Sequence, residues 1–192
     1  MPVINKAGVM TRPWSRRAVL CSTGTGIVLL SGCASFGSEQ STNSPIAPVS
    51  VEEIASVKCP PSGDDDATVC SQTVEADAAS VYLLPTPTVG ETPDSLELTF
   101  TNASGADLTF NPYSWSVWRK SASGWSEIEQ ESSGGGELTV AAGNSETWTV
   151  ETVVGYIDES AALHSGAYAA GINVPNPDGD DWITCLAVFG LR

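Results

Sequence analysis

Basic side chains are scarce in this 192-residue chain, which has 8 Lys and Arg against 23 Asp and Glu. Four of those eight lie within residues 1–32, a stretch without any acid. The rest of the chain therefore holds four basic side chains and all 23 acids, a formal charge of −19. Binding to nucleic acid or to an anionic lipid surface needs clustered Lys and Arg. We therefore expect no nucleic-acid partner and no basic lipid-docking patch.

Histidine and the usual catalytic motifs are equally scarce. The single histidine, His164, and the lack of a Cys-x-x-Cys pair argue against a zinc site. The acidic runs 64–66 and 178–181 lack EF-hand spacing and are interpreted as solvated loops. Ser160 and Ser165 lie near His164, but there is no G-x-S-x-G elbow, P-loop or dinucleotide-binding glycine pattern. We expect no metal, no cofactor and no enzymatic activity.

The acids are spread along the chain rather than gathered in one tail, and lysine is nearly absent. This pattern is typical of proteins from high-salt cells. Self-repulsion at such a charge destabilises a compact state unless salt screens it, and the Debye length falls to about 3 Å at molar salt. The composition predicts a fold that requires salt.

A long apolar run is also missing, since the best candidate, Ala18 to Leu30, has 13 residues and is too short to span a bilayer. It follows a basic lead that ends in Arg16-Arg17-Ala-Val-Leu and resembles a twin-arginine export signal. Leu-Ser-Gly-Cys at 30–33 resembles a lipobox, which implies that Cys33 becomes the lipidated first residue. Residues 1–32 are predicted to be a signal peptide, and the protein to be lipid-anchored on the outer face of the cytoplasmic membrane.

Three cysteines remain in addition to Cys33 and the signal-peptide Cys21. Cys59 and Cys70 bound an acidic, turn-rich loop, and a disulfide between them would contribute about 2–3 kcal/mol. The alternative pairing joins this loop to Cys185 in the last strand. Otherwise Cys185 is a buried free thiol.

Residues 33–72 are predicted to form the lipidated N-terminus, a flexible Ser/Pro/Gln-rich tether over 34–50 and the Cys-bounded loop. The tether is expected to extend as far as about residue 72, so that the folded domain spans residues 73–192.

From residue 81 onward, short alternating runs are separated by turn signals. The run "SLELTFTN" places Leu96, Leu98 and Phe100 on one face, which is typical of a half-buried strand. Similar runs include "YSWSVWRK", "ETWTVETVV", "GAYAAGINV" and "WITCLAVFG". We predict an all-β fold, an antiparallel sandwich of seven to nine strands, with no amphipathic helix.

The order of "LELTFTNASGADLTF", "WSVWRK", "LTVAAGNSETWTVE", "SGAYAAGINV" and "WITCLAVFGL" resembles bacterial immunoglobulin-like domains of short lipoproteins, here behind a haloarchaeal-type signal. The resemblance covers about residues 74–191. It implies an immunoglobulin-like sandwich with Tyr168 at the start of its sixth strand. Ala169 departs from the family, which usually has a basic residue there.

Asn102-Ala103-Ser104 is a glycosylation sequon on a predicted exposed turn. For the whole chain we predict a non-catalytic binding or scaffolding module at the cell surface. One alternative is a proteinase inhibitor that acts through an exposed loop at 173–182. Another is an accessory subunit of a membrane complex, which copurification with integral membrane proteins would reveal.

Overall fold

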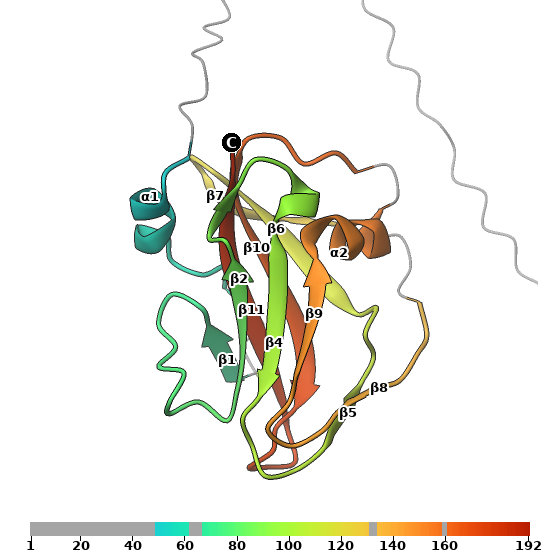
Figure 1. Ribbon diagram of the computed structural model, residues 1–192. Helices are drawn as coiled ribbons and strands as arrows, with labels where there is room; N and C mark the ends of the chain where they lie inside the picture. Colours follow the sequence, from blue (N-terminus) through green and yellow to red (C-terminus); the bar gives the residue numbers. More distant parts are fainter. Residues whose placement is uncertain (1–48, 62–66, 131–133, 159–160) are drawn as a thin grey trace, which may run out of the picture. The chain divides into compact units, whose positions relative to one another are not determined.

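The computed structural model describes residues 49–61, 67–130, 134–158 and 161–192. Contacts within the chain separate residues 1–42 from residues 43–192, and all described residues belong to the second unit. That unit consists mainly of strands, arranged in two sheets that pack face to face, with a short two-stranded ribbon at one end and two α-helices at the periphery (Figure 1).

The larger sheet has the strand order β1-β11-β10-β6-β7. Strands β11, β10, β6 and β7 pair in an antiparallel manner, whereas β1 and the short β3 run parallel to β11. The bounds are β1 Ala67–Cys70, β3 Val89–Gly90, β6 Trp115–Ser121, β7 Gly124–Ile128, β10 Gly166–Pro175 and β11 Trp182–Leu191.

The smaller sheet is antiparallel and has the order β2-β4-β9, while β5 and β8 form the separate ribbon. The bounds are β2 Val81–Thr86, β4 Glu97–Asn102, β5 Leu108–Phe110, β8 Leu138–Val140 and β9 Ser145–Thr149. A 3-10 turn, η1, covers Pro93–Ser95, and the helices are α1 Val51–Ser56 and α2 Val150–Ile157.

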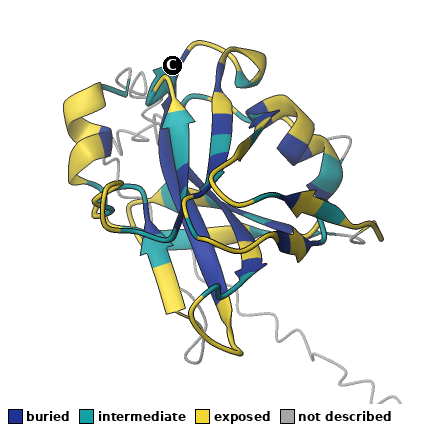
Figure 2. Ribbon diagram, turned by 60° about the horizontal axis from the view of Figure 1, so that its bottom comes forward, coloured by how far each residue is buried: buried dark blue, intermediate teal, exposed yellow. Residues whose placement is uncertain are grey.

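The core lies between the two sheets and is built by the alternation of apolar residues along each strand. Leu98 and Phe100 of β4 are fully buried, as the sequence pattern predicts. Trp115 of β6 meets Trp148 of β9 edge-to-face, with ring centroids 5.2 Å apart. Figure 2 shows buried residues concentrated on the central strands and exposed residues on the loops. The prediction of a β-rich fold is confirmed at this level.

The predicted strand "ETWTVETVV" is wrong in its second half, because the chain turns into helix α2 after Thr149. The Thr149 side chain accepts a hydrogen bond from the Thr152 N–H and so caps the helix. Val150, Val153, Val154 and Ile157 are all buried, which is the i, i+3, i+4, i+7 spacing of a helix face. Valine and threonine favour strands by intrinsic propensity, and this preference hid the helical period.

The strand count and the start of the domain also differ from the prediction. The described residues contain eleven strands and two α-helices, where we expected seven to nine strands and no helix. The folded unit begins before residue 73, because α1 packs on the larger sheet and β1 is one of its strands. Ser50 and Glu53 form a capping box at the start of α1, and Ile54 is fully buried.

Strands β1 and β3 cover the same edge of β11 at different heights. Strand β1 pairs with Ile183–Leu186, and β3 pairs with Gly190–Leu191. An unpaired edge strand is a hazard for aggregation, and these two short strands protect most of this one.

Candidate functional site

The outer face of the larger sheet has its own apolar cluster, separate from the main core. Ile54 of α1 packs there with Ala169 of β10 and Val188 of β11. Gly190 allows this close approach, because a Cβ at that position would lie 3.0 Å from Ile54 Cγ1. The N-terminal segment therefore covers one end of this face.

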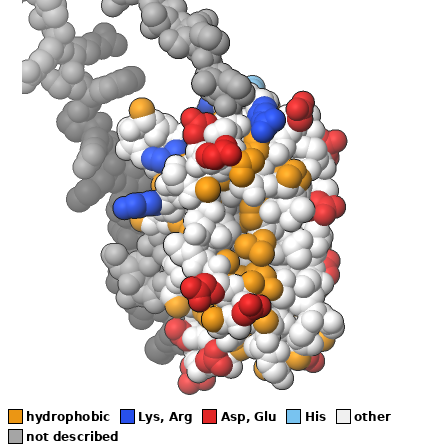
Figure 3. All heavy atoms as spheres, turned by 60° about the vertical axis from the view of Figure 1, so that its left-hand side comes forward, with side chains coloured by type: hydrophobic (Ala, Val, Ile, Leu, Met, Phe, Trp, Pro, Cys, Tyr) orange, Lys and Arg blue, Asp and Glu red, His pale blue; other side chains and the backbone are white. Residues whose placement is uncertain are grey.

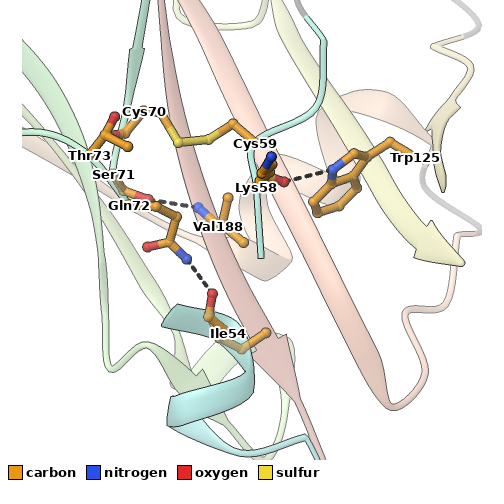
Figure 4. The surroundings of a disulfide bond; sticks show 9 residues. All are labelled: Ile54, Lys58, Cys59, Cys70, Ser71, Gln72, Thr73, Trp125 and Val188. Atoms are coloured by element: carbon orange, nitrogen blue, oxygen red, sulfur yellow. Dashed lines mark hydrogen bonds between the residues drawn. A yellow bond between two sulfur atoms is a disulfide. The ribbon is translucent and has the colours of Figure 1, made fainter. Parts of the chain in front are cut away.

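A disulfide between Cys59 and Cys70 holds the covering segment, with the two Cα atoms 6.3 Å apart (Figure 4). The Trp125 indole donates a hydrogen bond of 2.9 Å to the carbonyl of Lys58. The Gln72 amide donates a hydrogen bond of 2.6 Å to the carbonyl of Ile54. The structure thus forms the predicted bridge and not the alternative pairing with Cys185, which is free and buried.

The opposite end of the same face lies open and contains a pocket of about 380 Å³. Its lining residues are Asn111, Ser114, Asn173 and Trp182, and we call it the Trp182 pocket. The Trp182 side chain is 48% exposed, although large apolar side chains elsewhere in the described sheets are mostly buried. A pocket of this size falls within the range of small-ligand sites.

Strand register explains why these residues meet. Asn173 of β10 lies opposite Thr184 of β11, and Pro175 lies opposite Trp182. Ser114 directly precedes Trp115, which pairs with Ile172, so Ser114 comes beside Asn173. The β10–β11 hairpin and the residues that lead into β6, which are far from it in sequence, therefore contribute to one patch.

Hydrogen bonds fix the two amides and leave further polar groups available. The Thr184 hydroxyl donates to Asn173 Oδ1 over 2.7 Å, and Thr184 itself is buried. Asn111 donates to the Gly134 carbonyl over 2.9 Å and accepts from the Tyr113 N–H over 3.1 Å. Within the described part of the chain, no hydrogen bond uses Asn173 Nδ2, the Ser114 hydroxyl or the indole N–H of Trp182.

The acidic turn at 176–181 connects β10 to β11 beside the pocket and is closed by its own hydrogen bonds. The Asn176 N–H donates to the Asp181 carbonyl over 2.9 Å, and its side chain donates to Asp181 Oδ1 over 2.6 Å. Asp178 accepts a hydrogen bond of 2.9 Å from Ser80. Among the residues that the structure describes, no group of three or more His, Cys, Asp or Glu converges as a metal site.

Asn102 is fully buried at the end of β4, so the prediction of an exposed sequon on a turn is wrong. Its Nδ2 donates to the carbonyls of Ala106 and Val140, over 2.8 and 3.0 Å. Its Oδ1 accepts from the N–H and the hydroxyl of Ser104, over 3.1 and 2.6 Å. The side chains of Asn102 and Ser104 therefore stabilise the loop that follows β4. In the folded domain both N–H groups of Asn102 Nδ2 donate to backbone carbonyls and are not free for a glycan.

Burial raises the pKa of the Cys185 thiol from 9.0 to about 12, because desolvation disfavours the thiolate. The thiolate is the reactive form, so Cys185 in the native protein should resist dithiobis-nitrobenzoate near neutral pH and react fully in urea.

The same shift predicts how stability depends on pH. Above about pH 9 the unfolded chain loses this proton while the folded protein retains it up to about pH 12. The contribution of the protonated Cys185 thiol to the free energy of unfolding is therefore complete below about pH 9. It falls as pH rises and is smaller by about 2 kcal/mol at roughly pH 10.5. Urea unfolding of wild type and Cys185→Ala across this range would measure it. Equal losses in both proteins would contradict the assignment.

The remaining predicted residues fall into two groups. His164 is exposed, and its backbone N–H and carbonyl both contact the Tyr168 hydroxyl, at 3.1 and 2.8 Å. Arg16, Arg17 and Cys33 lie outside the described residues. Among the described residues, no helix is both long and apolar enough to cross a membrane.

Comparisons with known proteins give little. No family model and no curated protein matches the chain. A solved structure with a weak likeness is the alkylpurine DNA glycosylase AlkC of Pseudomonas fluorescens, bound to DNA containing an abasic site analog. The likeness has 15% identity and a TM-score of 0.27, and it covers 59% of this chain and 31% of that chain. A TM-score this low carries no argument about fold or function.

Sequence reasoning identified the segment 173–182 but not the Trp182 pocket. The sequence pattern predicts that Trp182 is the first residue of one strand. It predicts that Asn111 and Ser114 are turn residues before a different strand. The alternation of side chains along the last strand could have indicated it. Trp182 and Thr184 alternate with the core residues Ile183 and Cys185, so they lie on the outer face of the sheet.

Proposed function

We propose that this chain is a lipid-anchored extracytoplasmic protein whose folded part is a non-catalytic immunoglobulin-like binding module with a salt-adapted surface. The observation that carries the binding role is the open Trp182 pocket. The described residues that line it supply two amides, a hydroxyl and an exposed indole. None of these groups is a general acid, base or nucleophile suited to neutral pH, which supports binding rather than catalysis.

Strand order supports the immunoglobulin-like part of the proposal. The smaller sheet, β2-β4-β9, corresponds to strands A, B and E of such sandwiches. The order β11-β10-β6-β7 corresponds to G, F, C and C′. The hydroxyl of Tyr168, near the start of β10, bonds to the backbone of His164 four residues upstream. A tyrosine at the start of strand F with this upstream bond is a hallmark of the fold.

Support for the anchor comes from the motifs at Arg16-Arg17 and at 30–33. Two lipid chains on a cysteine hold a protein stably at a membrane, because each buried CH₂ contributes about 0.8 kcal/mol. The segment from Cys33 to Val49 would reach about 55 Å at full extension, enough to hold the domain clear of the lipid surface.

Fractionation of native membranes at multimolar KCl tests the proposal. Tagged wild type should remain with the membrane, and its intact mass should begin at Cys33 and include lipid. Cys33→Ser should be released, whereas the matched variant Cys21→Ser should behave like wild type, because Cys21 leaves with the signal. Replacing Arg16 and Arg17 by lysine should retain the precursor inside the cell. A wild type that is soluble and unlipidated would overturn the anchor. An integral membrane protein that copurifies with wild type would make the chain a subunit instead.

A further inference from the structure

We propose that the Trp182 pocket binds a neutral glycan, with a sugar ring stacked on the Trp182 indole and its hydroxyls bonded to Asn173 and Ser114. This inference rests on the proposed binding function and names its ligand class.

The exposed indole is the first reason. Trp182 is 48% exposed at the rim of a concave patch, although burial of a side chain of this size would be favourable. An indole face offers electron density to the C–H groups on the flat side of a pyranose ring. Such stacking requires no charge on either partner.

The second reason is the kind of polar group beside it. Amides and hydroxyls both donate and accept hydrogen bonds, as sugar hydroxyls do. Asn173 is already oriented, because the buried Thr184 hydroxyl donates to its Oδ1 over 2.7 Å and leaves Nδ2 for a ligand. A donor held in place by its neighbour costs little ordering entropy on binding.

Charge restricts the ligand to a neutral one. Among the described residues, the pocket lining contains no Lys or Arg, and the turn beside it carries Asp178, Asp180 and Asp181. Phosphorylated or carboxylated ligands would be repelled by this turn and by a mature chain of formal charge −19. A volume of about 380 Å³ accommodates about one or two hexose rings.

Calorimetric titration of the full chain with maltotetraose, cellotetraose and mannotetraose at multimolar KCl tests the inference. At least one should bind with a millimolar or lower Kd. Trp182→Ala should weaken that binding by at least about tenfold. Asn173→Ala should weaken it by about five- to tenfold, the size of one lost hydrogen bond.

Matched variants separate a site from a general loss of structure. Trp125→Ala removes a tryptophan whose indole is bonded to Lys58 on the covered end of the same face, and affinity should not change. Asn144→Ala removes an exposed asparagine outside the pocket and should also leave affinity unchanged. No binding of any of the three sugars, or equal affinity in wild type and Trp182→Ala, would overturn the inference. Membrane retention through Cys33 is measured independently, so a failed titration with an anchored protein rejects the ligand class and not the anchor.

Discussion

Replacing Asn102 by alanine is expected to lower the free energy of unfolding by about 3 kcal/mol. The side chain is fully buried and makes four hydrogen bonds, to Ala106, Val140 and twice to Ser104. Truncation leaves buried carbonyl and N–H groups without partners, and each such group costs about 1–3 kcal/mol. Asn102→Asp should be worse still, because a carboxylate oxygen would replace Nδ2 and face two carbonyl oxygens. Urea unfolding at multimolar KCl measures both changes.

Asn144→Ala is the matched control, because Asn144 contacts Asn102 only through a backbone hydrogen bond. Its carbonyl accepts a hydrogen bond of 2.9 Å from the Asn102 N–H, and its side chain is exposed. The loss of stability there should stay within about 0.5 kcal/mol. Similar losses in both variants would contradict the structural role of Asn102. A glycan at Asn102 in the intact mass of the folded protein would contradict it as well.

The strands of the main core were predictable because each carries its own evidence. Leu98 and Phe100 alternate with polar residues, and that local pattern determines both the strand and its buried face. The disulfide was predictable in part, since Cys59 and Cys70 are close in sequence and lie in a predicted loop. The twin-arginine and lipobox motifs are also local, but they lie outside the described residues and stay predictions.

Features that depend on distant partners were not predictable. Ile54 is apolar in a polar segment, and its burial depends on Val188 and Gly190, more than a hundred residues away. The helix α2 was hidden because its valines satisfy a strand pattern as well as a helical one. The Trp182 pocket depends on the pairing of β6, β10 and β11, which alternation alone does not fix. Sequence patterns therefore revealed elements, and tertiary pairing created the candidate site.

The domain is expected to lose much of its stability when KCl is lowered from multimolar to about 0.1 M. The Debye length increases over this range from about 3 Å or less to about 10 Å, so repulsion among neighbouring acids is screened much less. Figure 3 shows the acids (red) distributed over the visible face rather than gathered in one patch. Two of the few basic side chains contact neutral groups: Lys120 lies 5.7 Å from the Trp125 ring centroid, and Arg192 donates to the Val49 carbonyl. Since a typical domain is stable by only about 5–15 kcal/mol, unscreened repulsion can unfold it.

Molar salt also strengthens apolar burial, so a charge variant is needed to identify the cause. Glu97, Glu127 and Glu137 are exposed, and their joint replacement by glutamine removes three negative charges without altering the core. This variant should unfold at a lower KCl concentration than wild type, with a weaker dependence of Tm on salt. A triple variant with the half-buried Thr99 and the exposed Thr109 and Thr147 changed to serine keeps the charge and should retain the full salt dependence. If the glutamine variant and wild type respond equally to KCl, apolar burial rather than charge repulsion controls the salt requirement. If the KCl concentration at the unfolding midpoint falls in the glutamine variant and stays unchanged in the serine variant, repulsion among the surface acids is the cause of the salt requirement.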